Sequence, residues 1–139
     1  GVWDPRYPEA RELARRLELG AAVRFLGPVS EADLPALYAA ALAFAFPSEY
    51  EGFGLPLLEA MACGTPSMTS TTSSLPEVAG DAALLVPPTD VAAIAAALER
   101  LVTDSALRDD LARGGRARAL QFTWERTAER MWEEYDRLM

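Results

Sequence analysis

Hydrophobic positions in the first part of the chain alternate between helical and extended spacing. Apolar residues three and four positions apart predict helices over residues 8–19 and 31–41, and Ser30 stands where the second helix needs an N-cap. Residues 23–26, which are apolar apart from Arg24, and the apolar run at 42–46 predict strands, each closed by a glycine or a proline. Because the run at 42–46 has no polar position, we expect that strand to be buried on both faces.

The alternation continues through the middle of the chain. A loop over 47–54 contains two glycines and leads into a helix predicted over 55–63, where Pro56 suits the first turn. Further strands are expected near 67–69 and at 83–86. The first of these has flanks rich in serine and threonine.

After the last predicted strand the pattern is helical. The predicted helices cover residues 91–102, 105–119 and 124–138. Asp90, Asp104 and Thr123 precede them as N-caps, and Ser74 is expected to cap a single turn in the same way. Gly114-Gly115 is expected to kink or break the middle helix of the three.

Strands separated by single helices predict a fold class. The expected arrangement is a Rossmann-like α/β domain, with a parallel sheet, right-handed crossovers and flanking helices. No repeat or linker divides the chain, so residues 1–139 are expected to form a single domain with extra helices at its C-terminal end. The chain opens on a helix, whereas a doubly wound domain normally opens on a strand. We therefore expect the first one or two strands to lie upstream of Gly1, which makes the domain N-terminally truncated.

Composition narrows the classes of function. The chain has 139 residues, of which 50% are hydrophobic, and a net charge of −8 makes nucleic acid an unfavourable partner. All 13 basic residues are arginine, histidine is absent and Cys63 is the only cysteine, which argues against a metal site of histidine and cysteine. No apolar run approaches the ~20 residues of a membrane span, and we expect a cytoplasmic location.

The residues that carry chemistry lie where the strand at 42–46 passes into the next helix. Their sequence is Glu51-Gly52-Phe53-Gly54-Leu55-Pro56-Leu57-Leu58-Glu59. Glycines at this point let a backbone approach a ligand, and amides at a helix start favour an anion such as a diphosphate. Glu51 can reach a sugar, and Glu59 can accept hydrogen bonds from the vicinal hydroxyls of a ribose. On the residues alone, an ordinary strand-to-helix turn with solvated glutamates is an equal alternative.

This segment, with Glu-Ala-Met-Ala-Cys-Gly-Thr-Pro completing it, closely resembles the retaining GT-B glycosyltransferases of the group 1 (GT4-like) family. The resemblance extends in order to residues 23–27, 73–78, 80–86 and 122–125. It covers nearly the whole chain and implies the C-terminal, donor-binding half of a GT-B fold. It also implies a nucleoside-diphosphate (NDP) sugar as the substrate, with no cofactor and no protein-bound metal.

The resemblance assigns roles to individual positions. Glu51 matches the glutamate that contacts the donor sugar near its reacting carbon, which makes it the candidate catalytic residue, and Glu59 matches the glutamate that binds the ribose. The remaining donor-binding positions are Gly52, Phe53, Gly54 and Leu55, of which the last three match positions whose backbone amides meet sugar and phosphate oxygens. The loop after the strand at 23–26 matches the nucleobase site, with Val29 and Glu31 as the best candidates.

Ser67-Met68 departs from the pair of β-branched residues that the family usually has at this point, so we expect the strand near 67–69 to be weakened. A second departure limits the expected activity. The family neutralises the departing diphosphate with an arginine and a lysine, but this chain has no lysine and the matching segment lies upstream of Gly1. Without that segment and the N-terminal acceptor domain, we expect the chain to bind a donor but not to turn over. Any membrane association would come through the missing domain.

Three other functions compete with this interpretation. A non-catalytic nucleotide-sugar-binding module, or inactive remnant, is the main alternative. A sugar-nucleotide epimerase is disfavoured because the chain has no histidine, and a dehydrogenase because no Gly-x-Gly-x-x-Gly follows a first strand.

Overall fold

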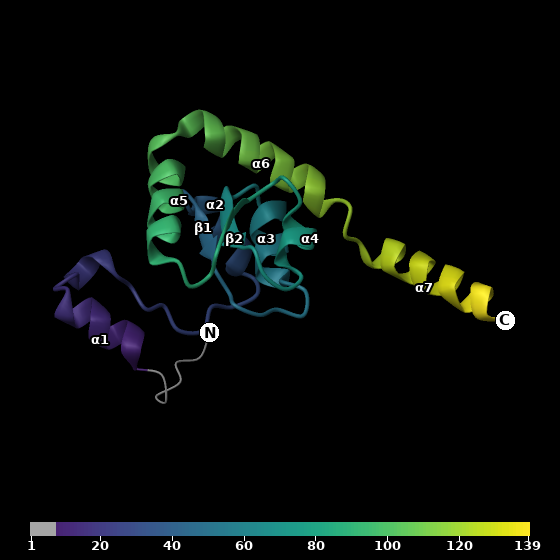
Figure 1. Cartoon of the computed structure of the whole chain (residues 1–139), viewed down its shortest axis with the longest axis horizontal. Coiled ribbons are helices and arrows are strands. Elements are labelled where there is room, and N and C mark those ends of the chain that lie inside the picture. Colours follow the sequence, from purple (N-terminus) through teal and green to yellow (C-terminus); the bar gives the residue numbers. More distant parts are fainter. Residues whose placement is uncertain (1–7) are drawn as a thin grey trace. The chain divides into compact units, whose positions relative to one another are not determined.

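A computed structural model describes residues 8–139, which fall into two compact units, one ending at Leu34 and one spanning Pro35–Met139. Figure 1 labels the elements along the chain. The helices are α1 (Glu9–Arg16), α2 (Leu34–Ala40), α3 (Leu55–Ala62), α4 (Leu75–Ala79), α5 (Val91–Thr103), α6 (Ser105–Ala119) and α7 (Trp124–Leu138). The strands are β1 (Phe44–Phe46), β2 (Ser67–Ser70) and β3 (Leu84–Val86).

The N-terminal unit contains α1 and a single 3₁₀ turn at Gly20–Ala22. The strand predicted at 23–26 is wrong, because these residues are irregular and Val23, Phe25 and Leu26 are exposed. A strand needs a neighbour to satisfy its backbone groups, and none of the described residues pairs with this segment. Ser30 does accept a hydrogen bond from the amide of Asp33 at 3.1 Å, but the helix itself begins only at Leu34.

The second unit contains a three-stranded sheet in the order β1-β2-β3, and both pairings are parallel. This confirms the predicted parallel α/β class. The burial expected of the strands is reversed, however. β2 pairs on both sides and all four of its residues are buried, whereas β1 pairs on one side among the described residues and exposes Ala45. A polar strand is stable in the centre because its hydroxyls have hydrogen-bond partners.

Helix N-caps follow the sequence closely in the C-terminal part. Asp90 accepts a hydrogen bond from the amide of Ala93 at 3.0 Å, and Asp104 accepts one from Leu107 at 2.9 Å. Thr123 accepts one from Arg126 at 3.2 Å. These contacts confirm the three predicted caps.

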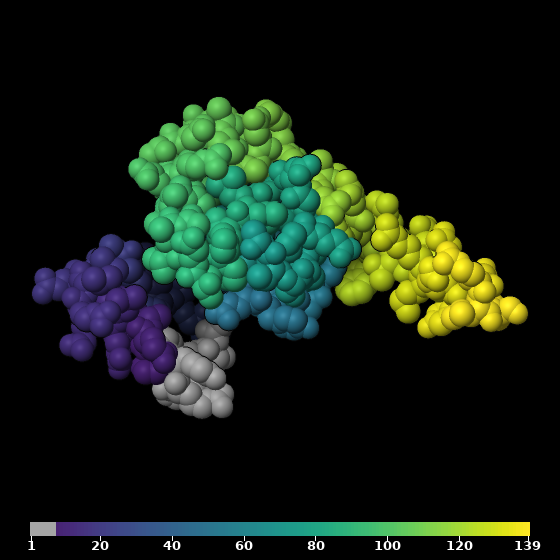
Figure 2. All heavy atoms as spheres, in the orientation of Figure 1, coloured from purple at the N-terminus to yellow at the C-terminus, as the bar shows by residue number. Residues whose placement is uncertain are grey.

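The hydrophobic core of this unit is divided between two clusters. One joins α3 and α4, with Leu57, Met61 and Leu75 fully buried. The other joins β2 and β3 to α5 and α6 through Met68 and Leu101, and Figure 2 shows the atoms of α5 and α6, in green, lying against the centre of the unit. The sheet is therefore flanked by helices, which hold the strand ends in fixed positions.

Gly114-Gly115 neither kinks nor breaks α6, which runs without interruption to Ala119. Gly115 is buried where α6 crosses α3, and a Cβ there would lie 3.4 Å from Met61 Cα. The expected break is wrong because the glycines provide room for a close helix crossing.

Substitutions at Gly115 test this packing. Gly115→Ala should be tolerated or raise stability by up to about 1 kcal/mol, because the contact is ordinary and alanine favours the helix. Gly115→Leu should lower stability by about 1–3 kcal/mol through overpacking against Met61. Urea unfolding measures both values, and equal stability of the two variants would contradict the close crossing.

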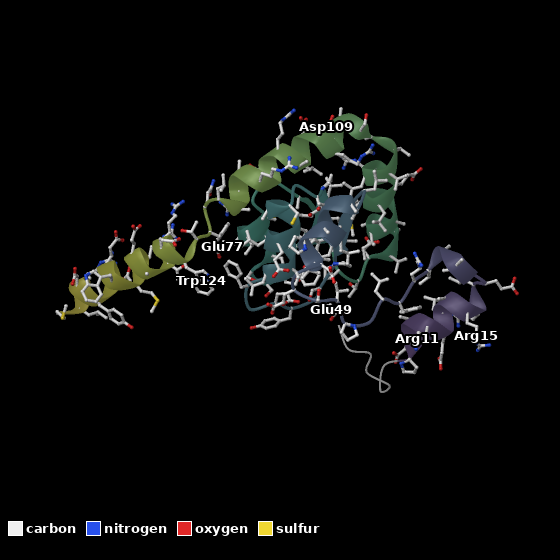
Figure 3. The ribbon with its side chains drawn as sticks, turned by 180° about the vertical axis from the view of Figure 1, so that it is seen from behind. Arg11, Arg15, Glu49, Glu77, Asp109 and Trp124 are labelled. Atoms are coloured by element: carbon white, nitrogen blue, oxygen red, sulfur yellow. The ribbon has the colours of Figure 1, made fainter. Side chains whose placement is uncertain are left out.

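The last helix, α7, has no buried residue. Its large apolar side chains are exposed, among them Trp124, Met131, Trp132 and Leu138. Figure 3 labels Trp124 at the start of this helix. Within residues 8–139, no helix is long and apolar enough to cross a membrane.

Candidate donor-binding site

The candidate site lies at the carboxyl end of β1, where a loop over residues 47–54 leads into α3. The next loop, 71–74, follows the carboxyl end of the parallel strand β2. Ligands of open α/β sheets bind at this edge, so the position predicted for the site is the one the fold favours. Figure 3 labels Glu49 within the first loop.

Gly54 forms the turn from the loop into α3. Its backbone is left-handed, with φ of 103°, and its carbonyl accepts hydrogen bonds from the amides of Leu57 and Leu58. A Cβ at Gly54 would come within 2.6 Å of Leu75 Cδ2, and Leu75 is fully buried. Only glycine fits here, for reasons of both conformation and space.

The start of α3 offers few amides to a ligand. Pro56 has no N–H, and the amides of Leu57 and Leu58 are already bonded to Gly54. The amide of Leu55 and those of the preceding loop are therefore the backbone donors near the helix start. With so few free amides at the helix start, an anion would be held mainly by loop amides and not by the helix alone.

Glu51 is half-buried, and its backbone is held by the neighbouring loop. Its amide donates to Ser73 Oγ at 3.1 Å, and its carbonyl accepts from Ser74 Oγ at 2.9 Å. The Glu51 carboxylate makes no hydrogen bond or ion pair among residues 8–139. Its backbone is thus fixed while its carboxylate is unengaged.

Glu59 lies in the second turn of α3, and its carboxylate is bonded to α2. Tyr38 Oη donates to Glu59 Oε2 at 3.2 Å. Burial, followed by the nearby Glu59 carboxylate, raises the pKa of Tyr38 to about 12, so the phenol remains a donor through neutral pH. Tyr38 also packs edge-on against Phe44, with ring centroids 5.2 Å apart. The Glu59 side chain is exposed but has a partner that orients it.

Phe53 contributes a partly exposed ring beside the loop. It meets Phe122 edge-on, with centroids 5.7 Å apart, and the Arg118 guanidinium lies 4.9 Å from the centre of the Phe122 ring. Arg118 in turn donates from Nε to the carbonyl of Val78 at 3.1 Å. The loop is therefore supported from the junction of α6 and α7.

The structure brings most of the predicted residues together. Glu51, Gly52, Phe53, Gly54 and Leu55 form one continuous turn, and Glu59 follows one helical turn further on. Val29 and Glu31 belong to the N-terminal unit, separately from these residues. Val29 is half-buried and Glu31 is exposed. Among residues 8–139, no group of three or more acidic, histidine or cysteine side chains is arranged to hold a metal ion.

Sequence reasoning missed two kinds of residue that support this site. Tyr38 falls within the helix predicted over 31–41 and was given no role in the site, although its hydroxyl reaches Glu59. Ser74 was expected to cap α4, but its side chain makes no capping bond and donates instead to the carbonyls of Glu51 and Phe53. The signal for the second was a run of serine and threonine directly after a strand.

The fold and the site define a class: a Rossmann-like α/β domain with a glycine turn at a strand end and a glutamate on the helix that follows. Residues 5–118 match the family described as glycosyl transferases group 1, and the chain belongs to this family. It is 52% identical over 103 residues to O-antigen chain mannosyltransferase B of Escherichia coli, a match covering 74% of this chain and 27% of that protein.

Solved structures agree with this assignment. Sucrose-phosphate synthase from Thermosynechococcus elongatus matches 99% of this chain with a TM-score of 0.86 and 36% identity. HepE of Anabaena, solved in complex with UDP-glucose, matches 94% with a TM-score of 0.81 and 26% identity. The C-terminal domain of a group 1 family protein from Francisella tularensis matches 85% with a TM-score of 0.75 and 30% identity.

These matches cover only part of each relative. The chain spans 37% of the sucrose-phosphate synthase chain, 36% of the HepE chain and 64% of the Francisella domain chain. The structure therefore corresponds to the C-terminal domain of a GT-B glycosyltransferase, in part.

Proposed function

We propose that this chain binds the NDP-sugar donor of a retaining glycosyltransferase. The observation that carries the proposal is the turn from Glu51 to Glu59, which joins a left-handed Gly54 to a carboxylate oriented by Tyr38. The UDP-glucose complex of HepE, a protein of the same fold, supports a nucleotide sugar as the ligand.

Each predicted residue has a role in this proposal. Glu59 accepts hydrogen bonds from the two ribose hydroxyls. The amides of Phe53, Gly54 and Leu55 face sugar and phosphate oxygens, and Gly52 lets the backbone approach them closely. Glu51 contacts the donor sugar near its reacting carbon, where a carboxylate stabilises developing positive charge. Val29 and Glu31 hold the nucleobase.

Transfer needs more than these groups. Departure of a diphosphate requires positive charge beside it, and this chain has no lysine to supply the ammonium group. We therefore propose that a further domain and further cations complete the active site and that this chain alone binds without turnover. A non-catalytic binding module is the alternative, and turnover by a longer protein that contains this chain would exclude it.

Thermal unfolding with a panel of UDP-, GDP- and ADP-sugars tests the proposed function. One nucleotide series should raise the midpoint, because a ligand that binds only the folded state stabilises it by an amount that grows with the logarithm of its concentration over Kd. Free ribose and inorganic phosphate serve as controls. An unchanged midpoint with every nucleotide sugar at millimolar concentration would contradict the proposal.

Tyr38→Phe tests the contact that orients Glu59. The variant keeps the ring packing against Phe44 but loses the hydroxyl, so nucleotide affinity should fall about fivefold while the fold is retained. Calorimetric titration of parent and variant gives the ratio. Equal affinities would show that Glu59 is oriented without Tyr38.

The same variant isolates the ionisation of Tyr38. The folded pKa of about 12 lies above the ordinary value of 10.0, so the stability it contributes is complete below pH 10 and lost as the pH rises through 12. The ultraviolet titration of the parent minus that of Tyr38→Phe should show a transition near 12. A difference transition at 10 would contradict the buried contact.

A further inference from the structure

Side-chain hydroxyls of the β2–α4 segment form a ladder of hydrogen bonds to the end of β1 and the loop over residues 47–54. The hydrogen-bond donors are Thr69, Ser70, Thr72, Ser73 and Ser74. The acceptors are the backbone carbonyls of Phe46, Ser48, Glu49, Glu51 and Phe53. We call these contacts the hydroxyl ladder. It runs the length of the loop, from the end of β1 to the residue before Gly54.

The ladder is densest at Glu51. Ser73 Oγ accepts from the Glu51 amide at 3.1 Å and also donates to the Glu51 carbonyl. Ser74 Oγ lies 2.9 Å from that carbonyl and 3.0 Å from the carbonyl of Phe53, so its proton is shared between them. Ser73 has a φ of 59°, a conformation that costs energy for a residue other than glycine and persists where surrounding bonds enforce it.

Peptide geometry gives the ladder a directional consequence. In a trans peptide, the carbonyl of one residue and the amide of the next point in opposite directions. The Glu51 carbonyl points at Ser73 and Ser74, so the Gly52 amide points away from them. The Phe53 carbonyl points at Ser74, so the Gly54 amide also points away. One pair of serines thus directs two glycine amides towards the side of the loop opposite the ladder.

Thr71 provides an internal comparison. It lies in the middle of the same segment and is exposed, and its amide donates to the Val86 carbonyl at 3.0 Å. Its hydroxyl makes no hydrogen bond among residues 8–139. Loss of this hydroxyl therefore changes the segment's composition without touching the ladder.

We propose that Ser73 and Ser74 are positioning residues for donor binding, which hold the backbone of Glu51 and direct the amides of Gly52 and Gly54 towards the donor diphosphate. This inference rests on the proposed function. It adds that the anion is bound by loop amides as well as by the start of α3. The direction of those loop amides is set by the two serines that follow β2.

The experiment compares four variants of this chain: Ser73→Ala, Ser74→Ala, Ser74→Thr and Thr71→Ala. Amide hydrogen exchange without ligand reports the loop, and calorimetric titration with the nucleotide sugar that stabilises the parent reports the site. Ser73→Ala should speed exchange of the Glu51 amide about tenfold, because it removes the acceptor of that amide. Ser74→Ala should weaken binding about tenfold. Ser74→Thr, which keeps a hydroxyl at an ordinary φ of −77°, should restore parental affinity, and Thr71→Ala should behave as the parent.

Three results would overturn the positioning role. They are unchanged exchange of Glu51 in Ser73→Ala, unchanged affinity in Ser74→Ala, and equal losses in Ser74→Thr and Ser74→Ala. Thr71→Ala could also weaken binding as much as Ser74→Ala. Loss of any hydroxyl in this segment would then have the same effect, and a specific role of the hydroxyl ladder would be excluded. Failure of the parent to bind any nucleotide sugar overturns the proposed function itself, and the positioning role with it. Overturning the positioning role alone leaves parental binding intact.

Discussion

Replacement of Gly54 by alanine should lower the free energy of unfolding by about 2–5 kcal/mol and abolish nucleotide binding. Two costs coincide at this position. A residue with a Cβ resists a φ of 103°, and the new methyl group would lie 2.6 Å from Leu75 Cδ2. Leu75 is fully buried in the cluster between α3 and α4, so a shift of its side chain would disturb the packing of that cluster.

Gly52→Ala is the matched control. Gly52 lies two residues earlier in the same loop, its φ is outside the left-handed region, and a Cβ there meets nothing within 4 Å. Urea unfolding should therefore place Gly52→Ala within about 0.5 kcal/mol of the parent. Similar losses in both variants would mean that the loop is not constrained at Gly54 as described.

Glu59→Ala should weaken nucleotide binding more than about a hundredfold, the value expected from losing two hydrogen bonds to a charged acceptor. The side chain is exposed and its one hydrogen bond among the described residues comes from Tyr38, so the fold should remain intact. Calorimetric titration measures the change in affinity. Thermal unfolding without ligand verifies that the variant is folded.

Glu49→Ala is the control for charge. Glu49 lies in the same loop and is exposed, and only its carbonyl takes part in the hydroxyl ladder. Removing its carboxylate should change affinity less than about threefold, since exposed charges are screened. If Glu59→Ala and Glu49→Ala bound as tightly as the parent, the assignment of Glu59 to the ribose would be wrong.

The elements with strong local signals were predictable from the sequence. Asp90, Asp104 and Thr123 cap helices because a side-chain oxygen two or three bonds from Cα reaches a free amide of its own first turn. The turn at Gly54 was equally local, since a glycine followed by Leu-Pro marks a helix start. These features depend only on residues within about four positions of one another.

The errors came from interactions between segments distant in sequence. The segment at 23–26 has a largely apolar sequence but pairs with no other strand among the described residues. Strand pairing depends on the neighbouring segments, so it cannot be predicted from these four residues alone. β2 was expected to be weakened because Ser67-Met68 departs from the family's usual β-branched pair, yet it is central because hydroxyls such as that of Thr69 reach carbonyls some twenty residues away. Gly115 was expected to break its helix because glycine is a poor helix former. Its packing role was missed because its neighbour Met61 lies on another helix.

The candidate site divides in the same way. The roles proposed for Glu51 and Glu59 come from their spacing and from the flanking motifs, because both residues lie on one continuous segment of the chain. Tyr38, Ser73 and Ser74 were not, since each acts on a residue 21–23 positions away. The sequence thus proposes the groups that would meet a ligand, whereas it gave no indication of the groups that orient them.

The most direct test of donor binding at this turn is a two-dimensional amide spectrum of the isotopically labelled chain, titrated with the nucleotide sugar that stabilises it. The largest shift changes should fall on the amides of residues 51–55 and on Glu59, with smaller changes in the supporting loop at 73–74. Pro56 has no amide proton and gives no signal. The amide signals of α5, which is remote from this loop in the chain, should not shift. Saturable shifts confined to other elements, with 51–55 unchanged, would contradict the account.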